Sequence, residues 1–152
     1  MALFVIGDLH LSLGADKPMD IFPGWEGYLP KLERNWRTLI GPTDIVVLAG
    51  DTSWGISLEE AEADFRFLDQ FPCKKYLVKG NHDYWWSTAT KMKNFFTEKG
   101  FTTLDILHNN CALYGDYALC GTRGWFFEED QKPHNAKVLN REVGRLEASL
   151  KA

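Results

Sequence analysis

Three apolar runs in this sequence are each followed by a short polar motif, and this repetition is the strongest constraint on the fold. The runs "LFVI" and "IVVLA" lead into "GDLH" and "GDTSWG", and the run "YLV" leads into "KGNHD". Runs that are apolar throughout, without alternation, are typical of strands buried on both faces of a sheet. We therefore predict buried strands at Leu3–Ile6, Ile45–Ala49 and Tyr76–Val78, each with polar residues at its carboxyl end.

Helical patterns lie between these strands. The first, Trp25–Ile40, ends before Gly41, which is followed by a proline and stops a helix. Its apolar stripe consists of Leu29, Leu32, Trp36 and Leu39.

A second helix begins near Ser57 and Glu60, which match a capping box. Its apolar face consists of Ala61, Phe65 and Leu68. A third helix covers about Ser87–Lys99 and ends at Gly100. Strands that alternate with helices predict an α/β fold with parallel strand pairing and right-handed crossovers.

The last third of the chain has a different character. Short strands at Thr103–Ile106, Cys111–Tyr114 and Tyr117–Cys120 are separated by tight turns, which predicts an antiparallel hairpin region. A loop, "GTRGWFFEEDQKP", then leads to a final helix. The apolar stripe of that helix consists of Leu139, Val143, Leu146 and Leu150, and we expect it to face a core.

Cysteine pairing has two interpretations. A turn at Gly115 and Asp116 places Cys111 opposite Cys120 on the paired strands, so a cross-strand disulfide is conceivable. Two reduced, buried thiols are the interpretation that we favour for a cytosolic chain, with Cys73 as a third free cysteine.

The charge and length of the chain limit the classes of partner that it can bind. Its 152 residues carry a formal net charge of −4, which argues against long nucleic acid, because binding a phosphate backbone needs a basic surface. Its apolar runs are shorter than the roughly 18 residues that span a membrane, and the start "MALFVIGDLH" lacks the features of a signal peptide. We therefore predict a cytoplasmic protein without a membrane partner.

Polar side chains at the ends of parallel strands meet at one edge of a sheet, where ligands bind in open α/β folds. The residues concerned are Asp8, His10, Asp51, Asn81 and His82. Carboxylate, imidazole and amide oxygen together suit Mn, Fe or Zn, and the absence of cysteine from the set argues against a closed structural zinc site. Each motif alone is equally consistent with a turn or a helix cap, but three at successive strand ends favour a metal site.

The motifs "GDLH", "GDTSWG" and "GNHD" resemble, in order and spacing, the GD-x-H, GD-x-x-D and GNH-[DE] motifs of the calcineurin-like metallophosphoesterases. The resemblance covers roughly residues 3–86, and the "GTRGW" segment is similar to a predicted-phosphohydrolase branch of that family. It implies a β-sandwich flanked by helices, with layers α/β/β/α. It also implies hydrolysis of a phosphomonoester or phosphodiester at a centre of two divalent metal ions, with Mn, Fe or Zn as candidates.

The same resemblance implies a role for each residue of the set. Asp8 and His10 would hold the first metal ion, Asp51 would bridge both ions, and Asn81 would hold the second through its amide oxygen. His82 would face the phosphate and would stabilise its charge or protonate the leaving oxygen. We expect a small phosphorylated metabolite or nucleotide as the substrate.

Two departures from the family pattern are visible. Trp54 stands where GD-x-x-D has its second carboxylate, which orients the catalytic histidine in one branch; Asp83 or a backbone carbonyl is an alternative for that task. The later histidines, His108 and His134, do not lie in the family's GH-x-H motif, and we interpret both as exposed loop residues.

The missing motif has consequences for the whole chain. Residues 1–152 are predicted to form a single metallophosphoesterase-like domain that is truncated, incomplete at its C-terminus, before the family's later His motifs. An uncovered face would then favour a homo-oligomer, marginal stability, or docking onto a completing segment. The alternative function is a non-catalytic metal- or phosphate-binding fragment that lacks the C-terminal ligands.

The aromatic residues and one arginine leave further alternatives. Trp85, Trp86, Trp125, Phe126 and Phe127 are core residues or a stacking wall for a nucleobase or aryl phosphate, and we favour the core for most of them. Arg123 either pairs with a substrate phosphate or forms a surface ion pair.

Overall fold

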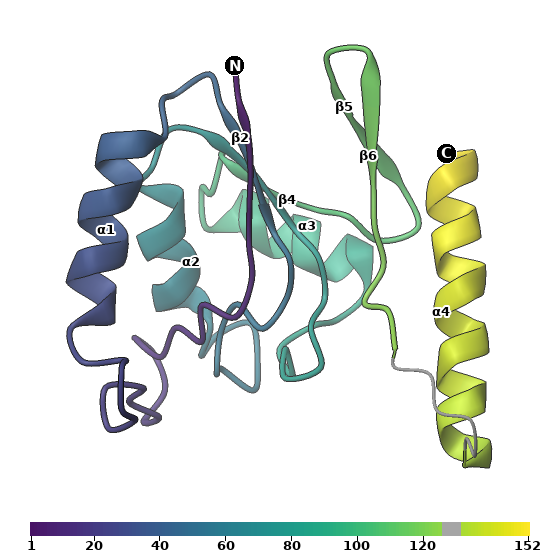
Figure 1. Cartoon of the computed structure of the whole chain (residues 1–152), viewed down its shortest axis with the longest axis horizontal. Helices are drawn as coiled ribbons and strands as arrows, with labels where there is room; N and C mark the ends of the chain where they lie inside the picture. The colour runs from purple at the N-terminus through teal and green to yellow at the C-terminus, as the bar shows by residue number, and fades with distance from the viewer. Residues whose placement is uncertain (126–131) are drawn as a thin grey trace. The chain divides into compact units, whose positions relative to one another are not determined.

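The computed structural model of the chain describes residues 1–125 and 132–152 (Figure 1). These residues divide into two compact units, Met1–Ile106 and Leu107–Ala152. Phe126 and Phe127, two of the predicted aromatic residues, lie outside the described part of the chain.

The described residues of the first unit form one four-stranded parallel sheet in the order β1-β2-β3-β4. Its strands are β1 (Leu3–Ile6), β2 (Ile45–Leu48), β3 (Lys74–Leu77) and β4 (Leu104–Ile106). The helices between them are α1 (Tyr28–Leu39), α2 (Glu62–Asp69) and α3 (Ala89–Glu98). The predicted mixed α/β class with parallel pairing is confirmed. The prediction for 103–106 is wrong, because β4 pairs in parallel with β3 and not in a hairpin.

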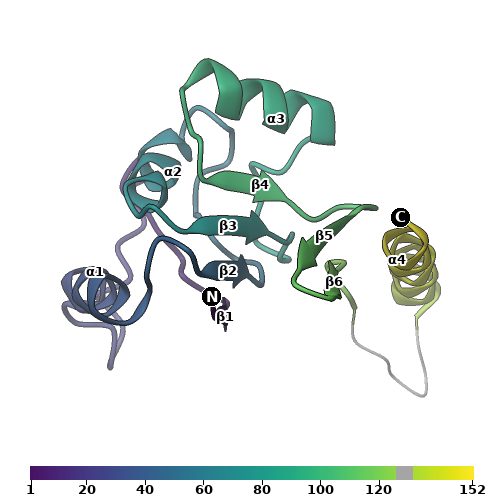
Figure 2. The same ribbon diagram turned by 90° about the horizontal axis from the view of Figure 1, so that it is seen from above.

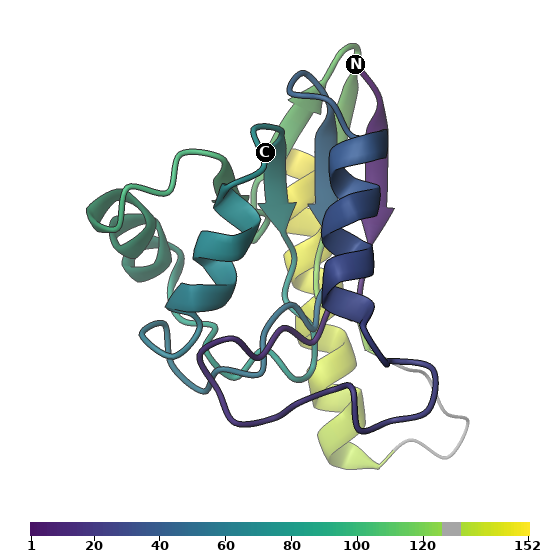
Figure 3. The same ribbon diagram turned by 90° about the vertical axis from the view of Figure 1, so that its left-hand side faces the viewer.

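Strands that follow one another in chain order place their crossover helices on the same face of the sheet. Figures 2 and 3 show α1 and α2 on one face, with α3 beside β4 at the sheet edge. Under these helices lies the core, which includes the fully buried side chains of Phe65, Leu68 and Phe71. The predicted apolar face of the second helix is thereby confirmed.

The exposure of side chains on β1 and β3 shows that the prediction of three strands covered on both faces is wrong. Strand β1 is an edge strand of the described sheet, and its Val5 and Ile6 are 65% and 37% exposed. Strand β3 alternates between half-buried and buried positions, and one of the buried ones is Lys75. The ammonium of Lys75 donates to the carbonyl oxygens of Phe71 and Cys73 and to Oγ1 of Thr103, which satisfies its polar head inside the core.

Local backbone geometry explains why the helices start later than predicted. Helix α1 begins at Tyr28 because Gly27 before it is left-handed, with φ 62°. One of the two bonds of the predicted capping box forms, since the Glu60 N–H donates to Oγ of Ser57, whereas the Glu60 carboxylate accepts from the N–H of Ile56 and not from that of Ser57. The bond to Ser57 closes a turn over residues 57–60, which ends before α2 begins at Glu62.

The second unit contains the hairpin β5 (Cys111–Tyr114) and β6 (Tyr117–Cys120) and the helix α4 (Pro133–Lys151). Cys111 is the cross-strand partner of Cys120, as predicted, and both thiols are free, which confirms the reduced interpretation; the expected burial is wrong, because both are half-buried. The prediction for the last helix is wrong: α4 buries Val138, Glu142 and Ser149, and not its apolar stripe. No helix in the described ranges has the length and apolar character needed to cross a membrane.

Candidate metal centre

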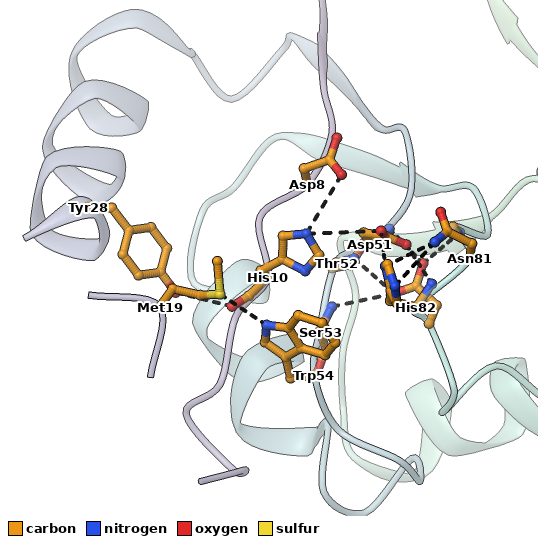
Figure 4. Close-up of polar contacts among 12 residues, drawn as sticks. Asp8, His10, Met19, Tyr28, Asp51, Thr52, Ser53, Trp54, Asn81 and His82 are labelled. Carbon is orange, nitrogen blue, oxygen red and sulfur yellow. Dashed lines mark hydrogen bonds and ion pairs between the residues drawn. The ribbon is translucent and has the colours of Figure 1, made fainter. Parts of the chain in front are cut away.

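The loops that follow β1 and β2 run side by side beyond the sheet. Backbone N–H groups of Asp8, His10 and Leu11 donate to the carbonyl oxygens of Gly50, Asp51 and Thr52 at 3.0, 2.9 and 3.0 Å. A parallel bridge between Leu11 and Ser53 continues the pairing. The "GDLH" and "GDTSW" motifs are therefore extensions of the sheet that bring their side chains to the same place (Figure 4).

The loop after β3 approaches this pair closely because two of the motif residues are glycines. A Cβ on Gly80 would overlap the backbone nitrogen and Oδ1 of Asp51. A Cβ on Gly50 would lie 2.7 Å from the Cα of Gly80, and Gly50 also has a φ of 109° that disfavours other residues. The glycines before Asp51 and Asn81 thus allow the two loops to touch.

The side chain of Asp83 holds the loops after β2 and β3 together. Its buried carboxylate accepts hydrogen bonds from the backbone N–H groups of Asp51, Thr52, Ser53 and Gly80 at 2.7 to 3.4 Å. It also accepts from the indole N–H of Trp85 at 2.9 Å. Because the Asp83 carboxylate accepts all of these hydrogen bonds, it supports the loops. It does not take the place of the family's carboxylate that orients the histidine.

Three predicted ligands form a compact cluster at the carboxyl end of the sheet. Donor atoms of Asp8, His10 and Asp51 all lie within 4.8 Å of one another. Nε2 of His10 is 3.7 Å from Oδ1 of Asp8 and 4.0 Å from Oδ2 of Asp51. Ligands at about 2.0–2.2 Å from one ion are separated by roughly 3–4 Å, so this donor set fits a divalent cation.

The backbone at all three residues is unusual. Asp8, His10 and Asp51 have φ values of 55°, 45° and 50°, in the left-handed region that residues other than glycine rarely adopt. Such conformations each cost roughly 1–3 kcal/mol and are held by the surrounding structure. Here the loop hydrogen bonds and the Asp83 carboxylate hold them, and the result is the convergence of the three donor groups.

His82 joins the cluster through Asp51. Its backbone N–H donates to Oδ1 of Asp51 at 2.8 Å, and its Nδ1 is 2.8 Å from Oδ2 of the same carboxylate. Asp51 therefore orients the imidazole, a task for which the sequence offered Asp83 or a backbone carbonyl. The amide of Asn81 lies 3.0 Å from Nδ1 of His82, so the structure places Asn81 beside His82 (Figure 4).

The carboxyl group of Asp51 is held in its charged form. Burial alone would raise the pKa of Asp51. The hydrogen bonds from the backbone and ring of His82, together with the charges of His82 and His10, outweigh burial and lower the pKa below its ordinary value. An ionised, buried carboxylate beside two imidazoles is suited to bind a cation.

Trp54, which stands at the position of the family's second carboxylate, packs against the candidate ligand His10. Its ring stacks on His10 with centroids 4.7 Å apart, and it lies 5.4 Å from the ring of His82. Trp25 contacts His10 edge-on at 6.1 Å, and the Tyr28 hydroxyl donates to the His10 carbonyl oxygen at 3.3 Å. The aromatic residues Trp25 and Tyr28 therefore adjoin the cluster together with Trp54, and sequence reasoning did not assign Trp25 or Tyr28 to the site.

Asp64 on α2 is a second buried carboxylate that the sequence did not single out. It accepts from the Leu13 N–H at 2.7 Å and from the Ser53 hydroxyl at 2.5 Å, and Oγ of Ser53 accepts from the Gly55 N–H. Burial raises the pKa of Asp64, although these two hydrogen bonds oppose the rise. Asp64 thereby ties the loop that carries His10 to the loop that carries Trp54.

Other predicted residues lie elsewhere. Trp85 is buried in the core, which confirms the interpretation that we favoured for it. Arg123 and Trp125 belong to the second unit, where the guanidinium lies 4.4 Å from the centroid of the Trp125 ring. His134 is exposed, but it lies in the first turn of α4 and not in a loop, and His108 is half-buried.

A parallel sheet with helices between its strands and a carboxylate–imidazole cluster at its carboxyl end places the chain among the α/β proteins that bind ligands at this edge of the sheet. Within that class, the chain belongs to the calcineurin-like phosphoesterase family, whose sequence model matches residues 1–142. Membership supports a metal-dependent phosphoesterase in general, and it confirms the family resemblance of the three motifs.

Comparison with solved structures adds a fold relative. The chain is similar to a protein of unknown function from Aquifex aeolicus, with a TM-score of 0.54 and 16% sequence identity. The match covers 98% of this chain and 75% of the other. At this identity the likeness concerns the fold alone. A search of curated proteins gave no match.

Proposed function

We propose that this chain hydrolyses a small phosphomonoester or phosphodiester at a centre of two divalent cations. The cluster of Asp8, His10 and Asp51 is the observation that carries the proposal, together with family membership. Asp8 and His10 would hold the first ion, Asp51 would bridge, and Asn81 would contribute to the second after its side chain turns from His82.

When bound, the cations supply positive charge that polarises a phosphoryl group and lowers the pKa of a water molecule toward neutral. The chain's own residues bind and orient the substrate. Nδ1 of His82 is anchored by the Asp51 carboxylate, and its Nε2 lies 3.3 Å from the amide nitrogen of Asn81. When Asn81 turns away, Nε2 of the imidazolium form of His82 can donate a proton or hydrogen bond to a phosphate or leaving oxygen. Its ring is 41% exposed, so a substrate can reach it.

The partner that we propose is a small phosphorylated metabolite or nucleotide rather than a polymer, since the net charge of the chain is −4. Manganese is the ion to test first, because carboxylate, imidazole and amide oxygen suit it. Arg123 remains a candidate for contacting the substrate phosphate.

The second candidate is a module that binds metal or phosphate without turnover. One observation favours it. Among the described residues, the side chains of His, Cys, Asp and Glu form one group that could hold a metal ion, and this group has only three members, Asp8, His10 and Asp51. A second ion would therefore depend on Asn81, on the shared Asp51 and on water.

Hydrolysis of p-nitrophenyl phosphate and bis-p-nitrophenyl phosphate with added manganese separates the two candidates. If the chain is an enzyme, the wild type should turn over these substrates, and His82→Ala should lower the rate at least about a hundredfold, the range expected for loss of a general acid. It should also disappear in Asp51→Asn. Asp116→Asn, in the exposed turn of the hairpin, is the matched control and should retain full activity. Manganese binding without turnover in the wild type would support the module instead.

A further inference from the structure

Two of the three cysteines lie opposite each other in the hairpin of the second unit. Cys111 is the ladder partner of Cys120, and both thiols are free and half-buried. Cys73, by contrast, is 1% exposed in the core of the first unit, where its sulfur accepts from the indole N–H of Trp36. The candidate metal centre uses none of these thiols. The facing pair, which a reagent in solution can reach, therefore has chemistry of its own.

The register of the hairpin brings Cys111 and Cys120 as close together as a ladder allows. A two-residue turn joins β5 to β6, so the flanking Tyr114 and Tyr117 form the hydrogen-bonded pair that closes it. Hydrogen-bonded and non-hydrogen-bonded pairs alternate along antiparallel strands, which makes the cysteines, three pairs further on, a non-hydrogen-bonded pair. The Cα atoms of such a pair are about 4.5 Å apart, within the roughly 4.4–6.8 Å that a disulfide spans. Both side chains also lie on the same face of the hairpin, so a bridge needs no change of register.

The thiol of Cys120 also contacts the end of α4, which lies beside the hairpin (Figure 1). It donates to the Ser149 carbonyl oxygen at 3.3 Å. This carbonyl is one of the last four of the helix, which have no partner within the helix itself. The Ser149 hydroxyl is held separately, because it donates to the Asn110 carbonyl oxygen and accepts from the Gly121 N–H. The reduced thiol is thus a cap on the last turn of α4, and other hydrogen bonds hold the helix to the hairpin.

We infer that Cys111 and Cys120 form a reversible disulfide, a redox-sensitive site separate from the candidate metal centre. The oxidant is a peroxide. The thiolate of one cysteine attacks a peroxide oxygen, which breaks the O–O bond and leaves a sulfenic acid and one water molecule. The second thiolate attacks the sulfenic sulfur, forms the S–S bond and releases a second water. In sum, two thiols lose two protons and two electrons to hydrogen peroxide, and a dithiol reductant reverses the change by thiol–disulfide exchange.

Oxidation has opposite effects on the two elements that the thiols contact. The bridge ties β5 to β6 at the end far from the turn, and it restricts the opening of the hairpin. A disulfide sulfur carries no hydrogen, so Cys120 no longer donates to the Ser149 carbonyl oxygen. The hairpin therefore becomes more rigid, while the last turn of α4 loses a cap.

Thiol counting and peptide mapping of the full chain test the bridge. Hydrogen peroxide should lower the number of thiols that can be alkylated after unfolding from three to one, and dithiothreitol should restore all three. Peptide mapping should place the disulfide between β5 and β6 and leave Cys73 as a thiol. Cys111→Ser should abolish the loss of two thiols, whereas Cys73→Ser, which makes the same substitution in the core, should still lose both of its thiols.

Three outcomes on the wild type overturn the bridge without depending on any variant. They are three intact thiols after peroxide treatment, a disulfide that includes Cys73, and sulfinic or sulfonic acid at the hairpin cysteines instead of a disulfide.

Hydrogen exchange on the reduced and oxidised wild type tests the effect on α4. In the oxidised chain the amides of β5 and β6 should exchange more slowly, those of the last turn of α4 should exchange faster, and those of β2 in the first unit should be unchanged. This comparison needs neither metal nor substrate, so its result is independent of the proposed function. A bridged chain in which the last turn of α4 exchanges no faster than in the reduced chain overturns the capping role of the Cys120 thiol.

Discussion

Asp83 and Asp64 build the site without belonging to the donor cluster. Each is buried, and each accepts hydrogen bonds from loops that are distant in the sequence: Asp83 from Asp51 and its neighbours, and Asp64 from Leu13 and Ser53. A backbone N–H that loses its acceptor inside a protein costs about 1–3 kcal/mol. The strained φ values of the candidate ligand residues persist because these carboxylates accept hydrogen bonds from the backbone of the loops around them.

Asp64 gives stability a pH dependence whose sign follows from its raised pKa. The folded chain holds the proton over a pH range in which the unfolded chain has already released it. The stability that Asp64 contributes is therefore fully present below its ordinary pKa, about pH 4, and is lost as pH rises through the folded-state value.

Urea unfolding of the wild type and of Asp64→Asn at a series of pH values measures this effect, because asparagine does not titrate. The free energy of unfolding of the wild type, relative to the variant, should decrease as pH rises above about 4. A difference that stays constant or increases across this range would contradict the raised pKa.

At the scale of single residues, sequence reasoning singled out the three candidate ligands that the structure brings together, but it did not predict the carboxylates that support them. Asp8, His10 and Asp51 were predictable because each stands a fixed distance after an apolar run. The carboxylates of Asp64 and Asp83 contact backbone groups that carry no sequence pattern. One signal was present: Asp64 adjoins Phe65 on the apolar face of α2, where an aspartate needs a buried partner.

At the scale of elements, the two glycines before Asp51 and Asn81 decide how closely the loops after β2 and β3 approach. The contrast with Gly7, the glycine before Asp8, is informative. A Cβ on Gly7 would lie 3.6 Å from the Cβ of Ala49, which is an ordinary contact, whereas a Cβ on Gly80 would overlap Asp51.

Gly80→Ala and Gly7→Ala form a matched pair that tests this contact. Gly80→Ala is expected to displace the Asp51 carboxylate and to lower the free energy of unfolding by roughly 1–3 kcal/mol, as for an overpacked core position. Gly7→Ala should change it by less than about 1 kcal/mol. Chemical denaturation measures both, and similar losses in the two variants would show that the close approach of the loops is not the cause.

The elements themselves were predictable where a long pattern existed and failed where one was short. The strand–helix alternation gave the parallel sheet, because apolar strands and amphipathic helices have distinct periods. The three residues of β4 carry too little pattern to distinguish a parallel edge from a hairpin. In α4 the apolar stripe was real, but hydrogen bonds of Ser149 and Glu142 determined which face the hairpin covers.

At the scale of the whole molecule, the candidate ligands and His82 lie in the first unit, and the apolar stripe of α4 lies in the second. The division into two units was not predictable, since it depends on contacts between segments far apart in the sequence. The predicted truncation before later His motifs stays a prediction.

The central claim is that Asp8, His10 and Asp51 together bind a divalent cation. Electron paramagnetic resonance of free manganese, titrated with the chain at neutral pH, measures this binding without any substrate. The wild type should bind saturably, and Asp51→Asn should bind at least about tenfold more weakly, since even supporting residues of a metal site change affinity by 10–100-fold. Equal binding by the wild type and Asp51→Asn, or no saturable binding by the wild type, would contradict the claim.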